Sequence, residues 1–302
     1  MQTNGLGVTL HESGLSGSRA RLPGRFLRYL IERFSLYSMV PACAIQYLFI
    51  THVAGVSAQW NDWPRWLTGF VTYIGVFLLL RLLDDMKDKR HDDRFYGERP
   101  VQRGLISLQE LAWLAGALLV VLTAANLLWS TPAGIGLYAA TLGYITLMRA
   151  EFFAPAFLRP RLLLYLLLHQ VFVPLLVAYV IYHHGARLQT TRDLLFLALN
   201  LLMVMAVEVA RKIRPSALDQ TGRDTYSAYL GRRGALIFLY LIVCSVQCLF
   251  VFLGLTPLWL ALLLLLPLLA GLYYDRTDSR AGSQLILGAT VVFLTVTMLA
   301  AL

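Results

Sequence analysis

Four aspartates lie close together at the end of an apolar segment, in a pattern that suits metal binding. Asp84, Asp88 and Asp92 follow one another at intervals of four residues, and Asp85 comes three residues before Asp88. On a continuous helix this spacing places all four carboxylates on about one face. Carboxylate oxygens on successive turns suit Mg²⁺, which keeps several waters and bridges to the phosphate oxygens of a substrate. The stretch therefore predicts a site for Mg²⁺ and a diphosphate group.

A solvated loop of mixed charge is the competing interpretation of the same stretch. Like charges at this spacing repel each other, and the helix dipole is unfavourable for anions at a helix C-terminus. Neighbouring basic residues offset part of this repulsion, namely Lys87, Lys89, Arg90 and Arg94. Under this interpretation the stretch is a charged loop just beyond an apolar helix and binds nothing.

The segments that would position these aspartates are far more apolar than those of a water-soluble protein. Of the 302 residues, 58% are hydrophobic and only 14% are charged, and the mean hydropathy is +0.64. Apolar runs of about 20 residues, the length that crosses the hydrocarbon core of a bilayer, recur along nearly the whole chain. We expect an all-α, polytopic membrane bundle of nine transmembrane helices. The expected spans are approximately Phe26–Ala54, Leu67–Leu83, Leu111–Leu128, Ala133–Met148, Leu162–Tyr182, Leu194–Ala210, Ala235–Gly254, Pro257–Tyr274 and Gln284–Leu302.

The basic residues predict how this bundle is oriented. Of the 26 Lys and Arg, only Arg65, Arg187 and Arg192 fall on one side of the nine-span arrangement. By the positive-inside rule, the N-terminus and the long loops after spans two and six are cytosolic, and the C-terminus lies on the opposite side. We expect residues 1–24 to be a flexible cytosolic segment and residues 25–302 to form the transmembrane catalytic domain. The basic residues form no long exposed tract, so the net charge of +9 predicts no nucleic-acid partner.

A turn and a new helix follow the aspartates. Pro100, which Arg99 precedes, prevents the helix from continuing, and Gly104 permits a tight turn. Ser107 and Glu110 then have the spacing of a capping box and predict the start of the third span.

The stretch from the aspartates to Ser107 resembles the first aspartate-rich motif of the UbiA superfamily of intramembrane prenyltransferases. That motif reads Asn-Asp-x-x-Asp-x-x-x-Asp followed by Arg-Pro-x-x-x-Gly-x-x-Ser, and here Asp84 stands in place of the asparagine. The resemblance implies a UbiA-like fold and Mg²⁺ as cofactor. It also implies catalytic and metal-binding roles for Asp85, Asp88 and Asp92, and a diphosphate contact for Arg99.

The loop after the sixth span stands where the family has a second acidic motif, but it diverges. Glu208 takes the place of the leading aspartate, and Lys212, preceded by Arg211, stands where another aspartate is usual. The resemblance makes Glu208 a catalytic metal ligand, while Arg211 and Lys212 would bind the diphosphate as a basic clamp. A plain ion pair between Glu208 and Lys212, four residues apart, is the alternative. Further along, Asp219 and Asp224 could line the same pocket, as could Asp84.

Three other polar residues near the expected spans are candidates. Tyr144 and Arg149 resemble the family's Tyr-x-x-x-Lys-Arg segment, with Met148 in place of the lysine. The resemblance implies that both bind the diphosphate, although interfacial anchoring would also explain them. His169 lies within an apolar run, where an ionisable residue either lines a cavity or makes a hydrogen-bonded helix contact.

These observations favour a Mg²⁺-dependent membrane enzyme that ionises an allylic prenyl diphosphate. In a UbiA-type prenyltransferase, an aromatic or other electron-rich acceptor then captures the prenyl group. In a UbiA-type terpene cyclase, double bonds of the prenyl chain itself capture the cation. A membrane transporter is a more remote alternative, because the charged residues cluster at one face and the spans contain few Gly/Pro-broken midplane segments.

Overall fold

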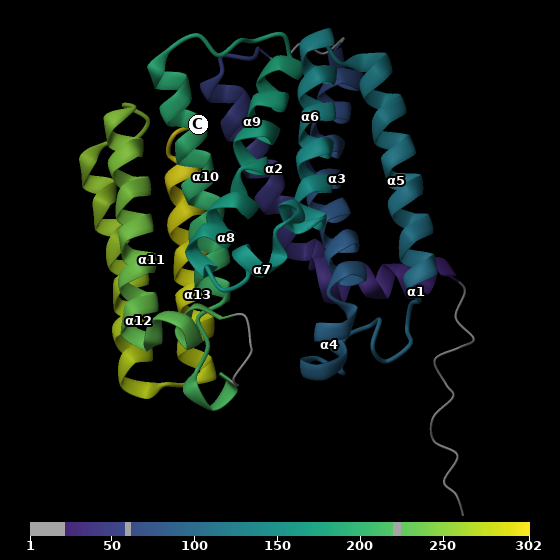
Figure 1. Ribbon diagram of the computed structural model, residues 1–302. Coiled ribbons are helices and arrows are strands. Elements are labelled where there is room, and N and C mark those ends of the chain that lie inside the picture. Colours follow the sequence, from purple (N-terminus) through teal and green to yellow (C-terminus); the bar gives the residue numbers. More distant parts are fainter. Residues whose placement is uncertain (1–21, 58–61, 220–224) are drawn as a thin grey trace, which may run out of the picture.

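A computed structural model describes residues 22–57, 62–219 and 225–302, and every regular element in these ranges is helical. The long helices run between two ends of the molecule, while α1 lies across one of these ends, close to α4 (Figure 1). The α-helices are α1 (Leu22–Tyr29), α2 (Leu36–Val53), α3 (Trp63–Lys87), α4 (Lys89–Phe95), α5 (Leu108–Trp129), α6 (Pro132–Arg149), α7 (Pro155–Leu158), α8 (Leu162–Gln170), α9 (Phe172–His183), α10 (Thr191–Arg211), α11 (Tyr226–Phe252), α12 (Leu265–Thr277) and α13 (Arg280–Leu299). Shorter helical turns are η1 (Leu30–Phe34), η3 (Glu151–Phe153), η4 (Ser216–Leu218) and η5 (Leu258–Leu264).

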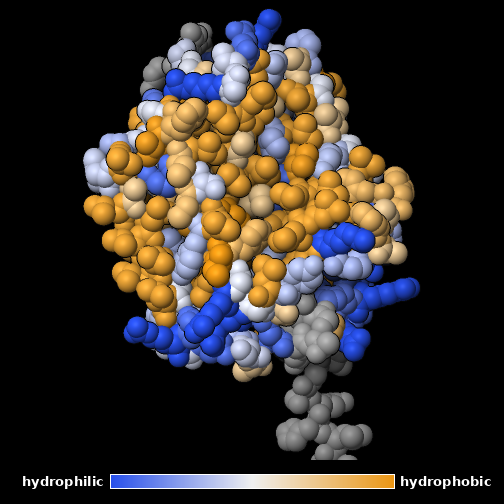
Figure 2. All heavy atoms as spheres, turned by 60° about the vertical axis from the view of Figure 1, so that its left-hand side comes forward, coloured by the Kyte–Doolittle hydropathy of each residue, from blue (hydrophilic) through white to orange (hydrophobic). Residues whose placement is uncertain are grey.

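The chain is a multi-pass integral membrane protein. Eight helical segments of the described residues are long and apolar enough to cross a bilayer, and they coincide with eight of the nine predicted spans. The segment predicted at Ala133–Met148 is α6, which has 18 residues but is interrupted by glycine, threonine and tyrosine and is less apolar than the others. Figure 2 shows apolar side chains over the middle of one face and hydrophilic side chains gathered towards both ends. The all-α membrane fold is confirmed, and eight of the nine predicted spans are both long enough and apolar enough to cross a bilayer.

The first predicted span, Phe26–Ala54, is wrong in its N-terminal part. The chain forms α1 and the wide turn η1, reverses at Ser35 and only then enters α2. Ser35 has φ 50° and ψ 58°, a left-handed conformation that a continuous helix cannot contain. The physical reason is the charge of this part, since Arg28, Glu32 and Arg33 are too polar to lie along a lipid-facing helix.

Helices pack in pairs along the bundle, and the last helix, α13, packs against α2 near the start of the chain. The principal pairs are α3 with α5, α6 with α9, α10 with α11, and α12 with α13. Helix α13 also packs against α10 and α2, and α2 contacts α3 and α9. The two halves of the chain are therefore joined across the interior, and the segments that follow α3 and α10 can contribute to one site.

Candidate functional site

A helix break divides the aspartate-rich stretch into two parts. Helix α3 ends one residue before Asp88, and α4 begins one residue after it. Asp84 and Asp88 are exposed, whereas Asp85 and Asp92 are buried. The four carboxylates therefore separate into an exposed pair and a buried pair, and their binding of Mg²⁺ stays a prediction.

Asp85 is saturated by partners from the N-terminal segment. Its Oδ2 accepts hydrogen bonds from the Tyr29 hydroxyl and from Arg33 Nε, each at 2.9 Å, and a second nitrogen of Arg33 binds Oδ1. Arg81 Nη1 lies 3.9 Å from the same carboxylate. Burial, reinforced by the Asp85 charge, raises the pKa of Tyr29, so this hydroxyl stays protonated and donates. Asp85 thus fixes Arg33 in a two-point contact.

Asp92 holds a second arginine in the same way. A guanidinium nitrogen of Arg99 binds the Asp92 carboxylate, and the guanidinium carbon lies 3.7 Å from the centre of the Tyr96 ring. The Asp92 carboxylate binds one nitrogen of the Arg99 guanidinium, and the Tyr96 ring stacks against its plane. These two contacts restrict the orientation of the Arg99 side chain.

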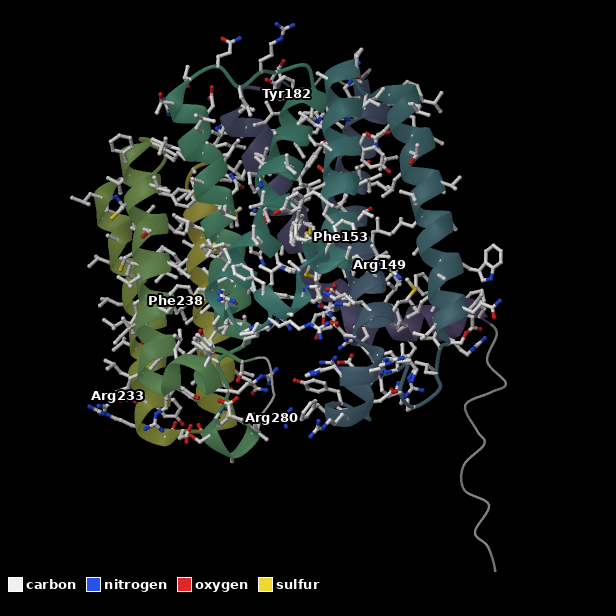
Figure 3. All side chains as sticks on the ribbon, viewed as in Figure 1. Arg149, Phe153, Tyr182, Arg233, Phe238 and Arg280 are labelled. Atoms are coloured by element: carbon white, nitrogen blue, oxygen red, sulfur yellow. The ribbon has the colours of Figure 1, made fainter. Side chains whose placement is uncertain are left out.

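A pocket of about 450 Å³ opens beside these two arginines. Its basic lining comes from four separate elements: Arg33 from η1, Arg99 from the α4–α5 loop, Arg214 from the loop after α10, and Arg280 from the start of α13. Figure 3 places Arg280 at the end of the bundle where α4 lies. The remaining lining residues are Glu32, Phe95, Tyr96, Glu98, Pro100, Leu218 and Thr225. Four guanidinium groups and two carboxylates leave the lining net positive, which favours an anion.

Glu208 is engaged by its own helix. Arg211 Nη2 lies 2.7 Å from Glu208 Oε2, and Lys212 Nζ lies 3.2 Å from Oε1. The ion pair between Glu208 and Lys212 that the spacing alone suggested is present. The end of α10 nevertheless lies near the first motif, because Arg81 in α3 interacts electrostatically with Arg211 as well as with Asp84.

A second charged cluster surrounds Glu151, which the sequence did not single out. The Glu151 carboxylate accepts hydrogen bonds from Arg159 at 2.8 and 2.9 Å, and Lys87 Nζ lies 3.3 Å away. The same lysine donates to the Tyr165 hydroxyl at 3.4 Å. The hydrogen bonds from Arg159 and the charge of Lys87 lower the pKa of Glu151 despite its burial. The three residues of η3 have φ between 49° and 57°, a strained left-handed turn for residues other than glycine.

His169 and Tyr144 make hydrogen bonds to backbone carbonyls of α8. His169 Nδ1 lies 2.9 Å from the Tyr165 carbonyl, and its ring stacks on Tyr165 with 3.7 Å between centroids. It interacts electrostatically with Lys87 and Lys212. The Tyr144 hydroxyl donates to the Leu168 carbonyl at 2.7 Å, which makes a link between α6 and α8.

Two other candidates lie outside these clusters. Arg149 is exposed at the end of α6 (Figure 3), and its side chain has no hydrogen bond or ion pair to any described residue. Asp219 accepts a hydrogen bond from the Thr225 hydroxyl at 2.5 Å, beside the arginine-lined pocket. Asp224 lies outside the described residues.

The acidic residues fit a divalent cation only in part. Among the described residues, no group of three or more His, Cys, Asp or Glu side chains could hold a metal ion. The carboxylates of Asp85, Asp92 and Glu208 already bind cationic side chains, and Asp88 interacts electrostatically with Lys87. Mg²⁺ commonly needs only one or two carboxylates when substrate phosphates complete its shell. Asp84 and Asp88, four residues apart and exposed, fit that requirement.

Several charged side chains of the candidate site and of the Glu151 cluster were missed by sequence reasoning, and only one left a usable signal. Arg33 was assigned to the interior of a span, where a charged residue should have indicated a helix break. Arg280 was used only as one of the basic residues that predict the orientation of the bundle in the membrane. For Glu151 and Arg159 the sequence offers no pattern, because their pairing depends on the strained turn at η3.

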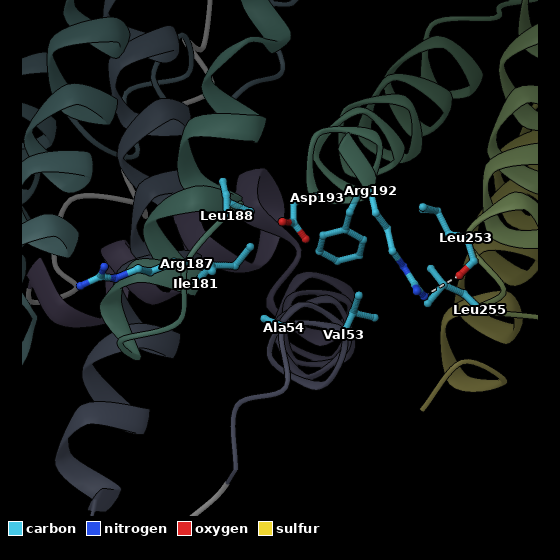
Figure 4. A pocket seen from close by; sticks show the side chains of 10 residues that line it. Val53, Ala54, Ile181, Arg187, Leu188, Arg192, Asp193, Leu253 and Leu255 are labelled. Atoms are coloured by element: carbon cyan, nitrogen blue, oxygen red, sulfur yellow. Dashed lines mark hydrogen bonds between the residues drawn. The ribbon is translucent and has the colours of Figure 1, made fainter. Parts of the chain in front are cut away.

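A further pocket of about 340 Å³ lies at the opposite end of the bundle, near the α9–α10 loop. Its lining is mostly apolar. Figure 4 shows the Arg192 side chain directed to the Leu253 carbonyl, to which it donates at 2.7 Å, while Arg187 points away from the pocket. Asp193 caps its own helix through Thr190. The polar groups here serve local structure, so the arginine-lined pocket is the better candidate.

The fold and this site define a helical membrane protein with a charged pocket at one end, and comparison with known structures specifies the fold. No protein-family model matches the sequence, and no curated protein matches it. One matching structure is the apo form of a UbiA homolog from Aeropyrum pernix K1, with 17% identity, a TM-score of 0.63, and coverage of 85% of this chain and 96% of that one. A second comes from work on digeranylgeranylglyceryl phosphate synthase in membranes, with 14% identity, a TM-score of 0.58, and coverage of 92% and 97%. The predicted UbiA-superfamily fold is confirmed.

Proposed function

We propose that this chain is an intramembrane enzyme that ionises an allylic prenyl diphosphate and transfers the prenyl group to an aromatic or other electron-rich acceptor. The observation that supports this most directly is the arginine-lined pocket beside the aspartate-rich stretch, at one end of a UbiA fold. The motif from Asp84 to Ser107 supports it as well. So do the matched structures, one of which concerns a digeranylgeranylglyceryl phosphate synthase.

Ionisation breaks the bond between the allylic carbon and the diphosphate oxygen, and the electron pair leaves with the diphosphate. Guanidinium groups around the pocket offset the charge that develops on this leaving group, which stabilises the transition state. Asp84 and Asp88 would hold Mg²⁺, which supplies further neutralisation of the diphosphate charge when it is bound.

The apolar interior suits the prenyl chain and its cation. Aromatic rings follow one another with centroids 5.5 to 6.1 Å apart, from Tyr47 through Tyr73 and Phe77 to Phe172. Their faces can stabilise a neighbouring carbocation. A terpene cyclase would use the same rings to fold the chain on itself, so it is the alternative product outcome for the same ionising site.

The deciding experiment incubates purified protein with Mg²⁺ and prenyl diphosphates of increasing length, first without and then with aromatic acceptors. We expect diphosphate release only when an acceptor is present, together with a prenylated product in the organic extract. Cyclic hydrocarbons or alcohols formed without an acceptor would identify a cyclase instead. Absence of turnover with every chain length and acceptor would contradict the proposed function.

The Asp88→Asn variant tests the metal in this proposal. It keeps the size of the side chain but removes the charge offered to Mg²⁺. We expect the Mg²⁺ concentration for half-maximal turnover to rise by about tenfold, since one charge-assisted contact contributes about 1.5–3 kcal/mol. An unchanged Mg²⁺ dependence would remove Asp88 from the metal site.

A further inference from the structure

The buried acids of the aspartate-rich stretch have a role that the motif resemblance does not assign. Asp85 and Asp92 each bind an arginine that lines the pocket, and among the described residues neither belongs to a metal-binding group of three or more His, Cys, Asp or Glu side chains. We propose that Asp85 and Asp92 are positioning residues that hold Arg33 and Arg99 for direct binding of a diphosphate group, without a metal between them. This inference rests on the proposed function for its ligand and deepens it.

The hydrogen-bond inventory of Arg33 supports this role. A guanidinium has five N–H donors in a planar fork. Asp85 takes one from Nε and one from a terminal nitrogen, which leaves three for a ligand in the pocket. Asp85 is itself held by the Tyr29 hydroxyl at 2.9 Å. The guanidinium is therefore oriented before the ligand arrives, which reduces the entropy lost on binding.

Arg214 and Arg280 complete the basic lining from the other half of the chain. The backbone of Arg214 is fixed on both sides, because its N–H donates to Ser227 Oγ at 2.9 Å and its carbonyl accepts from the Tyr274 hydroxyl at 2.5 Å. Arg280 is exposed, and its guanidinium makes no hydrogen bond or ion pair with a described residue, although its backbone carbonyl accepts from the Ser283 hydroxyl. Its guanidinium can turn towards an anion at no cost in existing contacts.

The acidic groups in the lining do not cancel this charge. Both carboxylate oxygens of Glu32 accept hydrogen bonds from Arg103 at 2.7 Å, and one of them also accepts from Arg28 at 3.0 Å. Those contacts lower the pKa of Glu32, and its negative charge is paired with Arg103 and Arg28, which do not line the pocket. Glu98 is exposed at the rim. The pocket volume of about 450 Å³ lies within the usual range of ~300–1,000 Å³ for small-ligand sites.

Binding of inorganic diphosphate in the presence of EDTA tests this role, because metal ligation is then impossible. Isothermal titration with the full chain in detergent should detect binding, and Asp85→Asn should weaken it by about tenfold, since a misplaced guanidinium loses charge-assisted hydrogen bonds. If Asp85 were merely a nearby negative charge, the same variant would strengthen anion binding. If it were only a metal ligand, affinity in EDTA would not change. Either result would overturn the proposal.

Two further variants keep the test decisive should Asp85→Asn fail to fold. Arg280→Gln removes one pocket guanidinium that supports no other described contact, so it should leave the melting temperature unchanged and weaken diphosphate binding in EDTA by about tenfold. Asp93→Asn is the matched control, because this exposed aspartate is paired with Lys89 and Gln102, which do not line the pocket. It should leave affinity in EDTA unchanged. Unaltered binding by Arg280→Gln would contradict the proposed pocket.

A prenyl thiolodiphosphate distinguishes the two sources of the diphosphate group. If this analogue competes with inorganic diphosphate and shows the same dependence on Arg280, the pocket holds the substrate headgroup. If only inorganic diphosphate depends on Arg280, the pocket holds the released product. Both outcomes support a diphosphate pocket. Diphosphate binding without any prenyl turnover would contradict the proposed function and leave this pocket standing.

Discussion

At the scale of single residues, Glu151 connects three elements through one buried carboxylate. It binds Arg159 near α7 and Lys87 at the end of α3, and its side chain is only 7% exposed. Lys87 in turn donates to Tyr165 in α8. Removing one partner of a buried ion pair leaves the others without compensation, so this carboxylate should contribute strongly to the stability of the loop between α6 and α8.

We expect Glu151→Gln to lower the free energy of unfolding by about 3 kcal/mol at neutral pH. Contacts with Arg159 and Lys87 lower the pKa of Glu151 below its ordinary value of 4.5. The carboxylate therefore stabilises the fold above pH 4.5, and this contribution is lost as the pH falls through the lowered pKa. Thermal unfolding in detergent from pH 7 to pH 3 should show the two proteins converging at acid pH. A difference that persists unchanged at pH 3 would contradict this account.

The same residues show how far a sequence can define a site. The positions of the aspartates follow from their spacing alone. Their partners do not, since Arg33 and Asp85 are separated by 52 residues and meet only because α1 lies across the end of α3. Whether Asp85 binds a metal or an arginine is thus decided by tertiary contacts, which local spacing does not encode.

At the scale of helices, local signals were the most reliable. The capping box at Ser107 and Glu110 is formed as the sequence predicts, because both partners lie within four residues. The start of the first span was wrong, because the break at Ser35 depends on where η1 packs. Glu110 also accepts from Arg25 at 2.5 Å, which ties α1 to the beginning of α5. That second contact had no sequence signal.

Close helix packing gives a prediction at this scale. A Cβ at Gly69 in α3 would lie 2.2 Å from the Tyr47 hydroxyl and 2.9 Å from the His183 ring. Neither neighbour can move freely, since Tyr47 pairs with His184 at 2.7 Å and His183 with the Arg65 carbonyl at 2.8 Å. Gly69→Ala should therefore separate α3 from α2 and α9 and cost about 2 kcal/mol through overpacking.

Gly116→Ala in α5 is the matched control for this substitution. A Cβ at Gly116 would meet nothing within 4 Å, so the change should leave stability unaltered or raise it by up to about 1 kcal/mol through helix propensity. Melting temperatures of both variants in the same detergent check the pair. Equal effects of the two substitutions would mean that close packing at Gly69 does not govern the stability of this contact.

At the scale of the whole molecule, the two ends of the bundle differ in both charge and structure. The end with α1, α4 and the arginine-lined pocket holds most of the basic residues, whereas Arg65, Arg187 and Arg192 belong to the other end. Figure 1 places the C-terminus at the end away from α1 and α4. By the positive-inside rule, the pocket end should face the cytosol and take the proposed diphosphate substrate from there.

Cysteine labelling tests this orientation. Replacing Cys43, Cys244 and Cys248 gives a background without thiols, into which Gly97→Cys or Leu302→Cys is introduced. Gly97 lies in the loop after α4, and a side chain there would meet nothing within 4 Å. A membrane-impermeant maleimide added to intact cells should label Leu302→Cys at once and Gly97→Cys only after the membrane is permeabilised. The reverse pattern would place the arginine-lined pocket outside the cytosol, and a prenyl diphosphate made inside the cell could then not reach it directly.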